Sequence, residues 1–158
     1  MSPALFGVAL AAAVGAGVNG GVFFAFSSFV MPALQRLPDA QGIAAMQSVN
    51  VTAVRPVFMS VLFGTAALCL VLIAWAIVSW DGSSPWLIAG GALFLLGVIA
   101  VTIAGNVPIN DAVAALDPHA PGAARAWDDH ARDWTLWNHV RAIAGAAAAA
   151  AFAVALTV

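Results

Sequence analysis

Residue types able to do chemistry recur at helical spacing where the last apolar segment of the chain begins. At about 100° per residue, one face of a helix there carries indoles, an imidazole, an amide and a guanidinium, from Trp127, His130, Trp134, Trp137, Asn138 and Arg141 to Gly145. The charged neighbours point away from this stripe, namely Asp128, Asp129, Arg132 and Asp133. Such a stripe, running directly into an apolar segment, predicts one wall of a polar pocket near a membrane surface.

The side chains that we assign to this pocket are of two kinds. Cationic and amide groups can stabilise a negatively charged oxygen, an effect worth about 3 kcal/mol per donor in known oxyanion sites; here they are Arg141, Asn106, Asn110 and Asn138. Aromatic rings can sandwich a flat ligand, and this role falls to Phe23, Phe26, Trp134 and Trp137. Together these groups could line a pocket that accepts a hydrophobic aromatic small molecule.

Composition places these residues in an integral membrane protein. Of the 158 residues, 63% are hydrophobic and 8% charged, with a mean hydropathy of +1.00, whereas soluble chains carry about 25% charged residues. The charges are five Arg and seven Asp, and the net charge of -2 predicts no nucleic-acid partner. The single Cys69 lies in an apolar run, which excludes a disulfide framework and a Cys-based metal site.

Four segments are long enough to cross a hydrocarbon layer about 30 Å thick, which takes about 20 helical residues. They cover roughly residues 3–31, 56–80, 85–107 and 137–158. Lipid requires these spans to be helical, because their backbone polar groups must be satisfied internally. We therefore predict an all-α protein, an antiparallel four-helix membrane bundle that forms a single domain over residues 1–158 and contacts the lipid bilayer. The fourth helix begins near residue 124 and, at about 50 Å long, projects from the membrane.

The two long links, residues 32–55 and 108–136, predict how the chain is oriented. All five Arg residues lie in these links or beside them. The positive-inside rule then places both links in the cytoplasm and both termini outside, in a multi-pass protein of the cell membrane.

An interfacial helix is predicted within the first link. Pro38 suits the first turn of a helix, and one side of that helix collects Ile43, Met46, Gln47, Asn50 and Val54. A short, weakly amphipathic helix of this kind suits a position over the mouth of the bundle. We expect it to act as a lid, with Asn50 at the site; a plain connector is the alternative.

Polar residues inside the predicted spans are few. Asn19 lies deep in the first span and needs a partner, which is either a hydrogen bond to another helix or a ligand. In the third span Thr102, Asn106 and Asn110 recur on one face, and Pro108 should kink or loosen the helix between the two amides. Small residues in the first span allow close helix packing and permit self-association into a homo-oligomer; they are Gly15, Gly17, Gly20 and Gly21.

The motifs that carry these residues resemble a known family. The segments FFAFS (23–27), VMPAL (30–34) and NVPIN (106–110), followed by Trp134, Trp137, Asn138 and Arg141, are similar to those of the anthrone oxygenase-like family of small four-span membrane proteins. Most bacterial members are known as a domain of unknown function. The resemblance covers nearly the whole chain and implies oxidation of an anthrone, or a related phenolic or quinol-type aromatic, with O2 as co-substrate and no metal or flavin cofactor.

That reaction needs a proton acceptor, and the sequence offers three. His130 shares the stripe of Arg141 and titrates near neutrality. His139 is closer in depth but points away from Asn138, and Asp111 is the third candidate. We take His130, Asn138 and Arg141 as the catalytic candidates and leave the general base open.

Other classes of protein fit the sequence less well. A haem with two His ligands is disfavoured because only His139 lies near a span, and a di-iron bundle needs Glu residues. Metal binding by His119 and His130 lacks compact ligand spacing, so no metal site is predicted. A transporter needs polar residues through the depth of the bundle. The open alternative is a non-catalytic membrane module, structural or ligand-binding, in which the amides and Arg141 lock the helices together.

Overall fold

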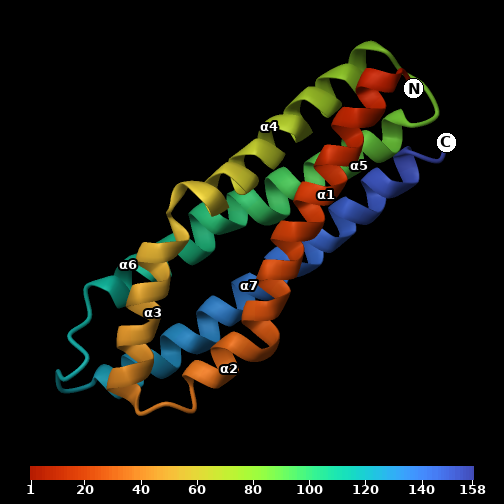
Figure 1. Ribbon diagram of the computed structural model, residues 1–158. Helices are drawn as coiled ribbons and strands as arrows, with labels where there is room; N and C mark the ends of the chain where they lie inside the picture. The colour runs from red at the N-terminus through yellow and green to blue at the C-terminus, as the bar shows by residue number, and fades with distance from the viewer.

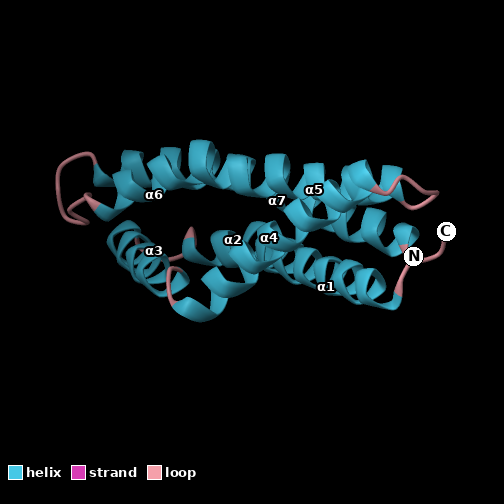
Figure 2. Cartoon of the chain, turned by 90° about the horizontal axis from the view of Figure 1, so that it is seen from above, coloured by secondary structure: helices cyan, strands magenta, loops and turns pink.

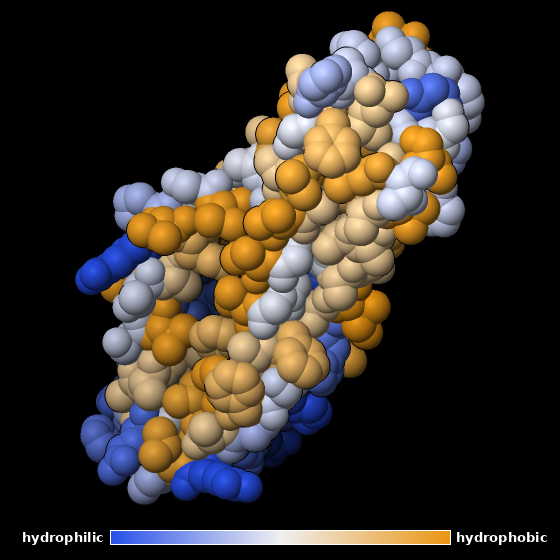
Figure 3. All heavy atoms as spheres, turned by 45° about the vertical axis from the view of Figure 1, so that its right-hand side comes forward, coloured by the Kyte–Doolittle hydropathy of each residue, from blue (hydrophilic) through white to orange (hydrophobic).

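The computed structural model describes residues 1–158 as helices joined by turns, with no β-strand. Four helices are long and apolar enough to cross a membrane, and they cover Pro3–Leu34, Pro56–Val78, Ser84–Ala114 and Ala123–Ala155. They lie side by side in one elongated bundle (Figure 1). Hydrophilic atoms gather at the two ends of the molecule and an apolar surface lies between them (Figure 3). The all-α four-helix bundle expected from composition is therefore confirmed, and these helices are those of a multi-pass membrane protein.

Each long helix packs against the helices that precede and follow it. The first helix, α1 (Pro3–Ala25), contacts α4 (Pro56–Val78), which contacts α5 (Ser84–Phe94), which contacts α7 (Ala123–Ala155). The last helix closes the ring by returning to α1, and both termini lie at the end where α4 turns into α5 (Figure 1). Lipid-facing helices gain nothing from apolar burial against each other, so their packing depends on close contact.

Close contact between α1 and α7 is provided by two glycines. A Cβ atom added to Gly145 would lie 2.9 Å from Cα of Gly20, and one added to Gly20 would lie 2.9 Å from the backbone nitrogen of Ala146. Gly15 faces α4 in the same way, because an added Cβ would overlap Thr65. Gly15 and Gly20 thus pack inside the bundle. The expected self-association remains a prediction, and it would have to use other surfaces of the protein.

Two of the long helices widen into π-helical turns immediately before a proline. The first is η1 (Phe26–Val30), followed by α2 (Met31–Leu34), which contains Pro32. In a regular α-helix the proline ring collides with the carbonyl four residues earlier and removes one hydrogen bond. A π-helical turn is wider, so it accommodates the proline ring and the missing hydrogen bond. The first helix therefore passes through Pro32 and ends at Leu34 rather than near residue 31.

The third membrane helix behaves in the same way. It runs from α5 through η2 (Leu95–Ala100) and η3 (Thr102–Asn106) into α6 (Val107–Ala114), with Pro108 in the first turn of α6. The loosening expected at Pro108 takes the form of the π-helical segment η3. The helix ends at Ala114, seven positions beyond the end expected near residue 107.

The interfacial helix expected in the first long link is α3 (Asp39–Ala53). It lies at the end of the bundle away from the termini, beside α6 and the start of α7 (Figure 2). Gln47 Nε2 donates hydrogen bonds of 2.9 Å to the carbonyls of Val113 and Leu116, which tie α3 to the end of α6 and to the residues just after it. Ile43 and Met46 are fully buried in the same contact.

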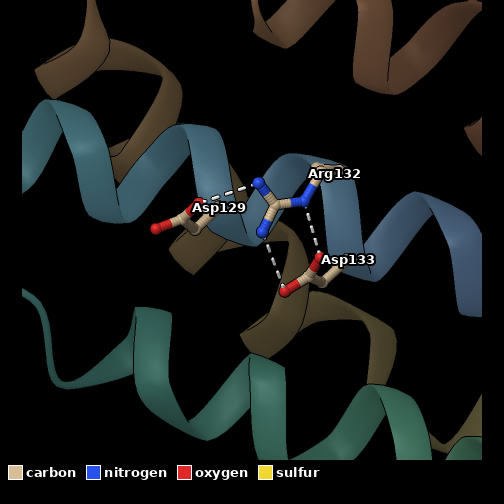
Figure 4. Close-up of polar contacts among 3 residues, drawn as sticks. All are labelled: Asp129, Arg132 and Asp133. Atoms are coloured by element: carbon tan, nitrogen blue, oxygen red, sulfur yellow. Dashed lines mark hydrogen bonds and ion pairs between the residues drawn. The ribbon is translucent and has the colours of Figure 1, made fainter.

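The first turns of α7 carry the solvated face expected from the sequence. Arg132 Nη1 lies 3.0 Å from Asp129 Oδ1, and Arg132 Nε lies 2.9 Å from Asp133 Oδ1 (Figure 4). All three side chains are at least half exposed, so these ion pairs add little to stability. The charged face is a feature of the solvent-exposed part of α7.

Candidate functional site

The centre of the site is the guanidinium of Arg141, which projects from α7 into the bundle and is 5% exposed. Its Nη2 donates a 2.7 Å hydrogen bond to Asn138 Oδ1, and its Nη1 lies 3.4 Å from Thr102 Oγ1. Its Cζ atom lies 4.3 Å from the ring centroid of Phe23 and 5.2 Å from that of Trp134. The ion pairs of the protein all involve Arg132, so this buried cation has no carboxylate partner.

Asn138 sets the direction of that guanidinium. Its Nδ2 donates two hydrogen bonds of 2.6 Å, one to the carbonyl of Phe23 and one to Ser27 Oγ. Because both amide hydrogens are committed to the first membrane helix, Oδ1 is left to accept from Arg141. The side chain is fully buried, so the contact between α1 and α7 determines where the cation lies.

The third membrane helix reaches the same place through its amides. Asn106 Nδ2 donates a 3.2 Å hydrogen bond to the carbonyl of Trp134, and Trp134 Nε1 donates a 2.8 Å hydrogen bond to Asn110 Oδ1. The Trp134 ring also packs against Phe26, with 5.8 Å between ring centroids. We call Phe23, Ser27, Thr102, Asn106, Trp134, Asn138 and Arg141 the Arg141 cluster.

Two atoms of the Arg141 cluster are buried without a hydrogen-bond partner. One is the acceptor Asn106 Oδ1 and the other is the donor Arg141 Nε. Buried polar atoms are nearly always paired, and each unpaired one carries a desolvation cost of about 1–3 kcal/mol. The hydrogen-bond network of the cluster is therefore open at two points, one donor on a cation and one acceptor on an amide.

His130 lies elsewhere, although it shares the stripe of Arg141. It lines a separate recess of about 400 Å³ between α6 and the first turns of α7, lined by Pro108, Ile109, Ala112, Val113, Leu116, Ala126, Asp129, His130 and Asp133. Eleven positions separate residues 130 and 141, which is about 16 Å along a helix axis. The imidazole is 7% exposed, stacks on Trp127 at 5.5 Å and has no partner for either ring nitrogen. The structure thus divides the single wall expected from the sequence into two sites.

The remaining candidates lie outside the Arg141 cluster. Trp137 is 42% exposed and its indole covers Gly105, where an added Cβ would lie 2.8 Å from Trp137 Cδ2; the expectation that it faces the site is therefore corrected. Asn19 Nδ2 bonds within its own helix, to the carbonyl of Gly15 at 2.8 Å, and not to another helix. Asn50 in α3 is half-buried with Nδ2 unpaired, and His139 and Asp111 are exposed.

Sequence reasoning left three contributors out of the site. Ser27 and Thr102 carried a usable signal, since both are hydroxyl residues close to polar or aromatic motifs in a span. Phe58 in α4 did not, although its ring meets the Phe23 ring edge-on with 6.2 Å between centroids. No group of three or more His, Cys, Asp and Glu side chains is arranged to hold a metal ion.

This geometry defines a helical membrane bundle with a buried guanidinium that has two aromatic rings beside it and no carboxylate partner. Over residues 55–151, more than half of its length, the chain matches the family model described as anthrone oxygenase. The chain belongs to this family. The matched part contains Thr102, Asn106, Trp134, Asn138 and Arg141. No curated protein and no solved structure shows a significant match.

Proposed function

We propose that the protein binds a hydrophobic phenolic or quinol-type aromatic at the Arg141 cluster and catalyses its oxidation by O2. The observation that carries this proposal is the buried guanidinium of Arg141 without a counter-ion. Such a charge is expensive to bury unless it is paired, and ionisable groups inside a membrane protein usually serve function. An anionic ligand oxygen supplies the missing partner.

Anthrone oxidation illustrates the chemistry. Loss of one proton from the central methylene leaves an anion whose charge is shared with the ketone oxygen, and Arg141 stabilises that oxygen. The anion gives its electrons to O2 as a C–O bond forms, and a proton equivalent to the one lost returns to the outer peroxide oxygen. The resulting hydroperoxide loses water to leave a second ketone, so that CH2 and O2 become C=O and H2O.

The other cluster residues have positioning roles in this scheme. Asn138 orients Arg141, and the rings of Phe23 and Trp134 enclose the guanidinium. Phe26 and Asn110 act on the site through Trp134, which both contact. His130 is too far along α7 to take the proton directly, so we assign it no step at the Arg141 cluster.

Access from the membrane fits the shape of the molecule. The apolar face in Figure 3 is hollowed near the middle, and hydrophilic atoms lie at the base of that hollow. We propose that the hydrophobic ligand enters laterally from the bilayer, with the α3 end in the cytoplasm and both termini outside. Impermeant thiol labelling in a Cys69→Ala background tests the orientation: Thr157→Cys should react on intact cells, and His119→Cys only after permeabilisation.

A second candidate is a non-catalytic module, and the two 2.6 Å bonds between Asn138 and the first helix favour it. The deciding experiment uses the protein in lipid nanodiscs with anthrone, following O2 consumption and anthraquinone absorbance. Arg141→Gln should abolish turnover in a protein that still unfolds cooperatively, while the exposed Arg132→Gln should turn over normally. Wild-type protein without turnover, or Arg141→Gln with normal turnover, would reject the enzymatic proposal.

A further inference from the structure

The two unpaired atoms of the Arg141 cluster, Asn106 Oδ1 and Arg141 Nε, define what the ligand must carry. We infer that Asn106 selects the ligand, by accepting a hydrogen bond from a hydroxyl group on the same molecule whose anionic oxygen is bound by Arg141. This inference rests on the proposed function, because it concerns the ligand of the same site.

The orientation of the Asn106 amide is decided by its neighbour. Its Nδ2 donates to the backbone carbonyl of Trp134, and a carbonyl oxygen cannot be partnered by Oδ1. The oxygen of the amide therefore points elsewhere, in a side chain with no exposed surface. Asn106 offers a fixed acceptor that no protein donor uses.

The unpaired donor, Arg141 Nε, is also fixed in position by neighbouring residues. Asn138 Oδ1 and Thr102 Oγ1 each accept one hydrogen bond from a terminal nitrogen of Arg141, whereas Nε has no acceptor. Thr102 and Asn106 belong to the same π-helical segment, η3, and lie about one turn apart. Both orphan atoms are also anchored beside Trp134, one through its ring and the other through its carbonyl.

A ligand with only an anionic oxygen would satisfy Arg141 and leave Asn106 unpaired. A site built to bond a hydroxyl rejects an analogue that lacks it, because the protein's own buried group is then left without a partner. The ligand class that satisfies both atoms is an apolar aromatic with an ionised oxygen and a second, protonated hydroxyl. An ordered water bound at Asn106 would instead make the site indifferent to the second hydroxyl.

Dihydroxynaphthalenes with hydroxyls at positions 1,3, 1,6 or 1,8, each paired with its monomethyl ether, separate these cases. Binding to the nanodisc-embedded protein is measured by calorimetry over a pH series in which one hydroxyl ionises. At least one isomer should bind about tenfold more tightly than its ether, the effect expected for an unpaired buried acceptor. Equal affinity for every isomer and its ether overturns the inference and needs no variant.

Variants then assign the selectivity to a residue. Asn106→Leu should reduce the preference for the dihydroxy isomer to about onefold, and Arg132→Gln should leave it unchanged; a preference that persists in a folded Asn106→Leu protein overturns the inference. Oxygen consumption keeps this result apart from the proposed function. Selective binding without turnover would reject the proposed oxidation and keep the inference about Asn106. Turnover with equal affinity and equal kcat/KM for an isomer and its ether would keep the proposed oxidation and overturn the inference about Asn106.

Discussion

Arg141 Nη2 donates a 2.7 Å hydrogen bond to Oδ1 of Asn138, one turn earlier on the same helix, and Nδ2 of Asn138 is held by the first membrane helix. The position of the buried cation therefore depends on a contact between residues more than a hundred positions apart in the chain. Any change that separates α1 from α7 should move the guanidinium as well.

Replacing Asn138 should lower the stability of the bundle. Asn138→Ala removes the two bonds to the first helix and the bond that Arg141 Nη2 donates to Asn138 Oδ1, with an expected cost of about 2–4 kcal/mol in the free energy of unfolding. Ser27→Ala is the matched control, because it removes one bond only and should cost about 1 kcal/mol. Reversible unfolding in mixed detergent measures both. Equal stabilities would show that these bonds do not hold the helices together.

A carboxylate placed beside Arg141 should compete with the ligand. Thr102→Asp replaces a hydroxyl 3.4 Å from Nη1 by a negative charge, which pairs with the cation and removes its need for an anionic ligand. Affinity for an ionised naphthol should fall at least tenfold, or about 1.4 kcal/mol. The nearly isosteric Thr102→Val should change affinity by no more than about threefold, since the lost contact is long. Unchanged binding by a folded Thr102→Asp protein would show that the anion binds elsewhere.

Close packing of α1 on α7 should tolerate no side chain at its tightest point. Gly145→Val brings a Cβ within 2.9 Å of backbone on α1, and we expect a loss of about 3 kcal/mol or failure to fold. Gly21→Ala, at a glycine with no atom within 4 Å of an added Cβ, should be neutral or slightly stabilising. Thermal unfolding of the two variants compares them. A Gly145→Val protein as stable as wild type would contradict the close approach.

The turn between α4 and α5 should respond to acid. The side-chain and backbone hydrogen bonds from Ser83 to Asp81 hold the pKa of that carboxyl below its usual value. A lowered folded-state pKa adds stability that is present above the unfolded-state pKa of about 3.9 and is lost as pH falls through the folded-state pKa. Limited proteolysis of the turn should accelerate below about pH 4, and Asp81→Asn should lose this pH dependence. Acid-independent cleavage of the wild type would contradict it.

The class of protein and the inward face of α7 could be read from the sequence, because hydropathy and helical period are local properties. Asn138 and Arg141 repeat at helical spacing, and lipid excludes groups of this kind unless they face the interior. The same argument identified Asn106 and Asn110 on one face of the third helix, which meets α7 through Trp134. For these residues, the helical period and the exclusion of polar groups from lipid were enough to predict which face of the helix they occupy.

Only the tertiary structure decided which of these residues share a site. Helical period reports direction around an axis and not depth along it, so His130 and Arg141 shared a predicted wall although about 16 Å separates them. Trp137, adjacent to Asn138 in sequence, lies outside against Gly105 because that glycine leaves room for an indole there. Pro108 predicted a disturbance of the third helix, but the packing of neighbouring helices determines whether a helix ends, bends or widens at a proline. Asn106 Oδ1 and Arg141 Nε can be identified as unpaired atoms only in three dimensions, because that requires the position of every neighbouring donor and acceptor.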